Sequence, residues 1–254
     1  MNIFSCVFVI IGAIIGAGFA SGKEIYTFFF VYGEKGIIGL VISFLLIGYI
    51  IYKSLKIIKK YNIKNYNEFL EIIIPKNEII KTMINFIINT FLLITFFIMC
   101  AGFCAYFNQE FGINTINSGI FIATISYLIL NKNAKGIFLI NSILIPLIIF
   151  FLIILGFKSY RTAGNIVNTI ETWRWFPKTI LYASFNSVTL ISILIPMKKY
   201  IKNKNDILKI SILSVIITMI IAYIIFLLLL NIKSDIAKIE LPTVHASRTF
   251  WKCI

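Results

Sequence analysis

Long apolar stretches separated by short polar connections follow one another along the whole chain. A stretch of about 17–25 apolar residues is what an α-helix needs to cross the hydrocarbon core of a bilayer. We predict an all-α, polytopic transmembrane helical bundle that forms one transmembrane domain over residues 1–254. Its seven predicted spans are 3–32, 37–52, 83–107, 116–130, 137–157, 176–197 and 207–231.

Two segments depart from this pattern. Residues 61–81 mix Ile and Phe with Lys and Glu, which predicts short interfacial helices interrupted at Pro75. Residues 239–246 read like the entry to another helix, but the polar stretch 247–254 follows instead of an apolar run. We therefore interpret 232–254 as the aberrant tail of a truncated or frame-shifted product.

The composition supports a membrane protein, since 59% of residues are hydrophobic and 13% are charged. A soluble domain would have to expose much of that apolar surface to water. The net charge of +14 comes from residues in the short connections rather than from one basic face, so we expect no nucleic-acid partner. The first apolar stretch continues past any small-residue cleavage site, so we do not expect a cleaved signal peptide. The expected location is the cell membrane.

The basic residues also predict an orientation. The connections on the side of the N-terminus, within 53–81, 132–135 and 198–209, carry about twice as many Lys and Arg residues as the other connections. Basic connections stay in the cytoplasm, so we expect a cytoplasmic N-terminus. Trp173 and Trp175 then fit an aromatic belt at the outer edge of the sixth span.

The first span is too long for one straight helix. Its roughly 30 residues would measure about 45 Å, which exceeds the hydrocarbon thickness unless the helix tilts steeply. Gly16, Gly18 and Gly22 each weaken a helix by about 1 kcal/mol relative to Ala. The pattern predicts a break in mid-membrane between Gly16 and Glu24, followed by a new helix over 24–32 that ends at Gly33.

The residues around this break predict a binding element. Ser21 and Glu24 have the spacing of a capping box, in which Ser21 accepts from the N–H of residue 24 and Glu24 bonds back to the N–H of Ser21. Free N–H groups would face an anionic group, and the carbonyls of Gly16 and Ala17 would ligate Na⁺. Discontinuous helices of this kind form the sites of many secondary transporters. The predicted solute-binding residues are Gly16, Ala17, Gly18, Phe19, Ala20, Ser21, Gly22 and Lys23.

A purely structural alternative exists for the same glycines. Gly12 with Gly16, and Gly18 with Gly22, are small-xxx-small pairs that let helices approach closely without any ligand. The adjacent Lys23 argues for a site, because a charge in mid-bilayer costs at least about 2.5–3.5 kcal/mol and is rarely idle. The companion acid at position 24 is equally well explained by the cap.

The sixth span offers a possible partner. Residues 182–189 carry hydroxyl and amide side chains inside an apolar run, five spans after the first, where an inverted repeat would place a matching interruption. We predict that Phe185, Asn186, Ser187 and Thr189 contact the solute. No Gly or Pro marks a break there, so a continuous helix whose polar face bonds its neighbours remains the alternative.

The chain lacks the residue patterns of common catalysts. It has no Ser-His-Asp or Cys-His arrangement, no H-E-x-x-H motif and no P-loop, and its one histidine, His245, falls in the predicted tail. The four cysteines lack metal-ligand spacing and are interpreted as packing residues. We expect neither an enzyme nor an ATP-driven pump, and no cofactor apart from a coupling Na⁺ or H⁺.

Residues 12–29, which read GAIIGAGFASGKEIYTFF, resemble the opening of the YkvI-type membrane proteins, which is close to GAGFASGQE followed by a Phe pair. That family is similar to the amino acid–polyamine–organocation superfamily, which has the LeuT-like fold. The resemblance implies two inverted five-helix repeats, with helices 1 and 6 interrupted around the substrate. It assigns 1–157 to the first repeat and 176–231 to two helices of the second, with helices 8–10 missing. Lys23 stands where the family has Gln, and a fixed cation there would replace a coupling cation.

These expectations combine into one functional prediction. The chain is a secondary transporter, or a truncated remnant of one, for a small solute such as an amino acid or related compound. Alternating access would rock helices 1, 2, 6 and 7 against the rest of the bundle. The alternative is a non-transporting integral membrane protein or an inactive fragment. The expected partners are the lipid bilayer and the solute, and the oligomeric state is not predicted.

Overall fold

The computed structural model describes residues 3–74, 77–131, 133–160, 173–232, 236, 239 and 241–251. Five helical segments among them are long and apolar enough to cross a membrane, judged by length and composition: Lys23–Lys60, Glu78–Phe111, Gly136–Gly156, Trp175–Tyr200 and Lys204–Leu229. Two shorter apolar helices, Ile3–Ile14 and Thr115–Ile129, fall within the predicted first and fourth spans. The all-α prediction is confirmed for the described residues, and five of the seven predicted spans correspond to helices of spanning length.

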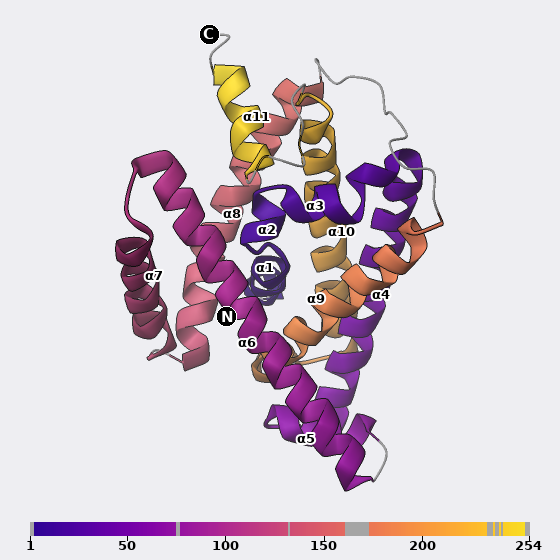
Figure 1. The fold of residues 1–254 in the computed structure, drawn as a ribbon. Coiled ribbons are helices and arrows are strands. Elements are labelled where there is room, and N and C mark those ends of the chain that lie inside the picture. Colours follow the sequence, from indigo (N-terminus) through magenta and orange to yellow (C-terminus); the bar gives the residue numbers. More distant parts are fainter. Residues whose placement is uncertain are drawn as a thin grey trace.

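Figure 1 shows the order of the elements along the chain. In sequence they are α1 (Ile3–Ile14), α2 (Ala17–Ala20), α3 (Lys23–Phe28), the 3₁₀ turn η1 (Phe30–Tyr32), α4 (Gly33–Lys60), α5 (Tyr66–Ile73), α6 (Glu78–Phe111), α7 (Thr115–Leu130), α8 (Asn133–Tyr160), α9 (Trp175–Met197), the 3₁₀ turn η2 (Lys198–Tyr200), α10 (Lys204–Leu229) and α11 (Pro242–Trp251).

Four helices form the tightly packed part of the molecule. Helix α1 lies against α9 and α10, and α4 lies along both α9 and α10. The side chain of Tyr182 on α9 is fully buried at the centre of an aromatic cluster, with ring centroids 4.9 Å from Phe29 and 6.1 Å from Phe44. In a bilayer no water drives apolar helices together. Van der Waals contact between large side chains such as these stabilises their packing instead.

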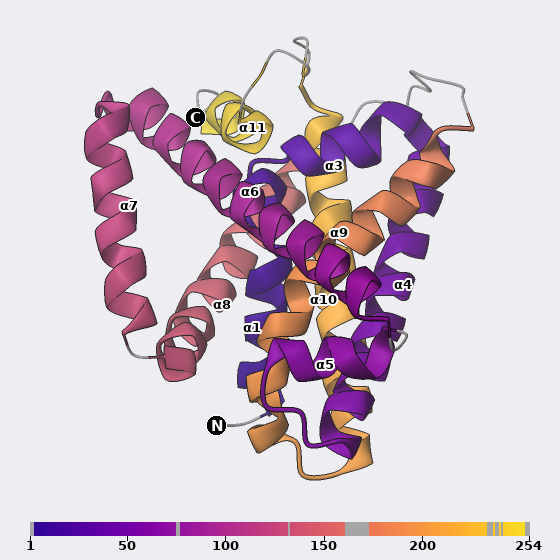
Figure 2. The ribbon, with the colours of Figure 1, turned by 60° about the horizontal axis from the view of Figure 1, so that its bottom comes forward.

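Helix α8 packs against α1 and α10, whereas α6 and α7 are packed more loosely. Helix α6 crosses in front of the bundle and joins α7, and α7 continues into α8 (Figures 1 and 2). Only 6% of the apolar part of α6 is buried, against 50% for α10. Its exposed side chains, among them Phe86, Leu93 and Phe97, are those of a helix that offers its surface to lipid.

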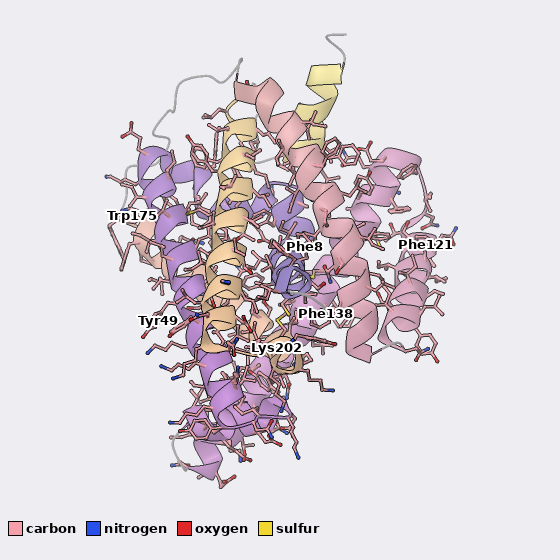
Figure 3. The ribbon with its side chains drawn as sticks, turned by 180° about the vertical axis from the view of Figure 1, so that it is seen from behind. Phe8, Tyr49, Phe121, Phe138, Trp175 and Lys202 are labelled. Atoms are coloured by element: carbon pink, nitrogen blue, oxygen red, sulfur yellow. The ribbon has the colours of Figure 1, made fainter. Side chains whose placement is uncertain are left out.

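Two connections that the charge pattern predicts on the same side of the membrane do meet in the structure. The ammonium of Lys198 donates to the backbone oxygen of Asn62 at 2.9 Å, and Lys59 donates to the carbonyl of Lys202. Figure 3 shows Lys202 near the lower end of the bundle and Trp175, at the start of α9, towards the other end. The cytoplasmic assignment of this end stays a prediction, and Lys132 of the third connection lies outside the described residues.

The end of α4 and the start of α5 were not predicted from the sequence. Helix α4 continues eight residues beyond the predicted boundary to Lys60, because Leu55 and Ile58 stay buried while Lys53 and Lys56 face outward. The predicted interfacial segment contains α5, whose N-cap Asn65 accepts from the N–H of Glu68 at 2.9 Å. Pro75, where we expected an interruption, lies outside the described residues.

Candidate functional site

The first span is interrupted at the predicted place. Helix α1 ends at Ile14, α2 makes a single turn, and residues 21–22 form a turn before α3 begins at Lys23. Gly22 has φ 81°, a left-handed backbone conformation that glycine adopts at little cost. The chain thereby changes direction, so that α3 runs across α10 instead of continuing along α1 (Figures 1 and 2). We call residues 15–22 the first-span break.

The predicted capping box at the first-span break is wrong. Gly22, and not Ser21, is the N-cap of α3, and it has no side chain that could cap this helix. Because Gly22 is left-handed, the Ser21 hydroxyl accepts from the N–H of Lys23 at 3.3 Å and donates to the carbonyl of Gly18 at 3.0 Å. The new helix also ends earlier than predicted, at Phe28, and Gly33 begins α4 instead of terminating a helix.

The glycines of this region have two different roles. A Cβ at Gly12 would collide with the amide of Asn141 on α8, and one at Gly16 would lie 2.7 Å from Cε of Met99 on α6. These two glycines allow neighbouring helices to approach, as the packing alternative proposed. Gly18 is different, since a Cβ there would lie 2.9 Å from Cγ of Glu24 and closer still to its carboxylate. The absent side chain of Gly18 makes room for a charged group.

The predicted interruption of the sixth span is also wrong. Helix α9 is continuous from Trp175 to Met197. The amide of Asn186 donates to the carbonyl of Tyr182 at 3.0 Å, and the hydroxyl of Ser187 donates to that of Ala183 at 2.7 Å. Side chains that bond back to their own helix in this way leave its backbone ladder intact. The alternative of a continuous helix is correct, with the polar groups bonded to α9 itself.

A cavity of about 550 Å³ opens between the first-span break, α3, α6 and α9, a size typical of small-molecule sites. We call it the break cavity. Its lining residues are Gly18, Ser21, Lys23, Glu24, Thr27, Phe28, Thr95, Ile98, Met99, Ala101, Gly102, Ala105, Phe185 and Leu241. The side with hydroxyls and charges comes mainly from the first-span break and α3, and the apolar side comes from α6 and α9.

The structure brings together only some of the predicted solute-binding residues. Gly18, Ser21, Lys23 and Phe185 line the break cavity, together with Glu24, the predicted cap residue. The others lie in the same two segments outside the lining. They are Gly16, Phe19, Ala20 and Gly22 in the break, and Asn186, Ser187 and Thr189 on α9. The side chain of Ala17 lies outside the described residues.

Helix α6 supplies the wall that the sequence prediction missed. Thr95 and Met99 face the break cavity, and Phe91 stacks edge-on against Phe185 with ring centroids 5.4 Å apart. Helix α6 is apolar all round, so hydrophobicity gave no reason to select one of its faces. The spacing of Ala101 and Ala105 was the available signal, because small residues four apart mark a face that another segment approaches closely.

Residues far along the chain bind the first-span break. The hydroxyl of Thr243 donates to the carbonyl of Ala20 at 2.7 Å, and its backbone N–H donates to the carbonyl of Ser21 at 2.9 Å. The ammonium of Lys23 donates to the carbonyl of Ile239 at 3.0 Å. The predicted aberrant tail therefore contains an ordered helix, α11, whose first turn satisfies carbonyls that the break releases.

The two charged residues beside the break are held differently. Lys23 directs its ammonium at Ile239, and this nitrogen lies 5.8 Å from the ring centroid of Tyr26. Glu24 has no hydrogen-bond or ion-pair partner among the described residues, although its carboxylate lies against Gly18 in the break cavity.

The residues that were predicted to hold an ion are already partly engaged. The carbonyl of Gly16 accepts from the N–H of Ala20 at 2.9 Å. No group of three His, Cys, Asp or Glu side chains suited to a metal ion occurs in the described part of the chain. Sodium at the carbonyls of Gly16 and Ala17 stays a prediction.

Comparison with known proteins points to two bacterial relatives. The chain is 28% identical to the "uncharacterized membrane protein YkvI" of Bacillus subtilis (strain 168) over 214 residues, which are 80% of this chain and 59% of YkvI. It is 26% identical to the "uncharacterized protein YyaD" of the same strain over 235 residues, 92% of this chain and 68% of YyaD. The match thus spans less than two thirds of the length of YkvI. No family model and no solved structure matches the chain. The similarities support a YkvI-like membrane protein.

Proposed function

We propose that the chain forms the solute-binding part of a secondary transporter for a small solute, an amino acid or a related compound. The observation that carries this proposal is the break cavity, because it joins the non-helical backbone between α1 and α3 to a pocket of ligand size. Irregular backbone at membrane depth is tolerated where it lines a cavity or is buried in protein. In transporters, such backbone forms the substrate site.

The two walls of the break cavity suit a small amphiphilic solute. Ser21, Thr27 and Glu24 provide hydrogen-bonding groups on one side. Met99 and Phe185 provide an apolar surface on the other. A site with mostly apolar walls and a few convergent polar groups is the usual form of a small-molecule pocket.

The packing of the helices supports movement by alternating access. Helices α1 and α4 both pack against α9 and α10, whereas α6 meets this group mainly through the short helix α2 and through Phe91, which lies against Phe185 of α9. We propose that the four-helix group rocks against α6 and α7, which would open the break cavity to each side of the membrane in turn. The LeuT-like architecture, the cytoplasmic N-terminus and coupling to Na⁺ or H⁺ belong to the same proposal.

Uptake by purified protein in proteoliposomes tests the proposal. Labelled amino acids are offered under inward gradients of Na⁺ or H⁺. We expect Gly18→Leu to reduce uptake at least tenfold, because the new side chain displaces Glu24 and fills the cavity. Gly119→Leu on α7 is the matched control, since a Cβ there meets its nearest atom at 3.9 Å, and its uptake should stay within twofold. Equal uptake by both variants would show that the break has no role in transport. No uptake by the unmodified protein would favour a non-transporting membrane protein.

A further inference from the structure

We propose that the break cavity selects solutes that carry a cationic nitrogen, with the carboxylate of Glu24 as the counter-charge. The inference rests on the proposed function, in which this cavity holds the solute. It goes further by assigning a charge to the solute and a recognition role to one residue.

The position of the Glu24 side chain depends on the first-span break. Its carboxylate occupies the space that a side chain at position 18 would need, since a Cβ at Gly18 would lie 2.9 Å from Cγ of Glu24. Both residues line the break cavity. A glycine at position 18 is thus what allows the acid to fold back against the break and border the cavity.

Among the residues that the structure describes, no cation forms an ion pair with this carboxylate. Lys23 is next to it in sequence, but its ammonium turns to the carbonyl of Ile239. The ion pairs formed between described residues join Lys81 to Glu71 and Glu78, near the start of α6, far from Glu24 in the sequence. An acid within a membrane-spanning segment normally faces a cavity and pairs with a cation, so a cationic ligand completes the site.

The opposite wall defines the rest of the solute. Ile98, Met99 and Phe185 present aliphatic and aromatic groups to the cavity. A primary amine attached to an aliphatic chain places its nitrogen at Glu24 and its carbon chain on this wall. Zwitterionic amino acids with apolar side chains meet the same description, and carboxylates that lack the amine do not.

A matched pair of ligands separates these classes. Isoamylamine and 4-methylpentanoate are the decarboxylated and deaminated analogues of leucine, so they share its branched chain and differ in charge. Their binding to the full chain in nanodiscs is measured by titration calorimetry at neutral pH. We expect isoamylamine to bind at least tenfold more tightly than 4-methylpentanoate.

Three variants test whether Glu24 causes the preference for the amine over the acid. Glu24→Gln should weaken the binding of isoamylamine at least tenfold, and Glu24→Asp should retain the preference for the amine. Glu71→Gln removes one negative charge from the exposed surface of α5, outside the cavity, and should stay within twofold. Thermal unfolding identifies any variant that fails to fold, in which case the Glu24→Asp result decides.

Several results would overturn the inference. They are equal affinity for the amine and the acid, unchanged binding of isoamylamine by Glu24→Gln, and binding of neither ligand. Unchanged amine binding with a loss of proton-driven uptake in Glu24→Gln would mean that Glu24 carries a proton instead. Amine-selective binding without any uptake would leave this inference standing and remove the transport proposal, so the two failures are distinguishable.

Discussion

The first-span break and the polar run of α9 carry similar sequence signals but have different structures. Both place small and polar residues within an apolar run, and both were predicted to interrupt a helix. The first span breaks between Ile14 and Lys23, whereas α9 passes through residues 182–189 without interruption. Polar residues inside a span are thus a weak sign of a break, and clustered glycines are a strong one.

The physical difference is where the backbone finds its hydrogen bonds. On α9, Asn186 and Ser187 donate to carbonyls one turn earlier, so the helix keeps its own bonds and gains extra ones. In the first-span break, glycine permits a left-handed residue at position 22, and the released carbonyls of Ala20 and Ser21 are satisfied by Thr243. A break therefore needs partners from elsewhere in the chain.

The largest effect is expected where the break depends on glycine. Gly22→Val places a β-branched side chain at φ 81° and its Cβ 2.9 Å from Cγ2 of Thr243. Backbone strain and overpacking should together lower the free energy of unfolding by about 3 kcal/mol. Thermal unfolding in detergent measures it, with Gly119→Val in the open helix α7 as control. Equal melting temperatures for the two variants would show that the left-handed residue is not required.

A smaller effect is expected for the distant partner of the break. Thr243→Val keeps the shape of the side chain but removes its hydrogen bond to the carbonyl of Ala20, which should cost about 1 kcal/mol. Thr189→Val on α9 is the matched control, because that hydroxyl bonds the carbonyl of Asn186 in its own helix. Unfolding experiments should show a loss for Thr243→Val alone, and equal losses would contradict the contrast between the two regions.

The smallest effect on the free energy of unfolding is expected for a substitution on α9. Ser187→Ala removes a hydroxyl whose acceptor, the carbonyl of Ala183, belongs to the same helix. The change should alter the free energy of unfolding by less than about 0.5 kcal/mol and leave isoamylamine binding unchanged. Calorimetry and thermal unfolding of one preparation provide both values. A loss of binding would place Ser187 in the solute site after all.

The spans and the position of the break could be predicted from the sequence because both depend on local chemistry. Apolar stretches of membrane length and the clustered Gly16, Gly18 and Gly22 act through the residues themselves. Helix ends were less predictable. Helix α4 continues past Tyr52 through two turns that carry lysines, because one face of these turns is buried. The length of the apolar stretch does not indicate this extension.

The site was only partly predictable because it depends on contacts between distant segments. The place of Glu24 follows from the left-handed turn at Gly22, so the spacing of Ser21 and Glu24 was misleading. The wall from α6 follows from how that helix crosses the first-span break, and the role of Thr243 follows from the return of the chain after α10. Of these features, only the α6 wall has a periodic signal, the small residues Ala101 and Ala105 four positions apart.

Hydrogen–deuterium exchange in nanodiscs, with and without isoamylamine, tests the central claim that the first-span break is a solute-binding element and α9 is an intact helix. The account predicts fast exchange over residues 15–24, slowed by the amine, and slow exchange over 182–189 under both conditions. Equal protection of the two segments, unchanged by the amine, would contradict it.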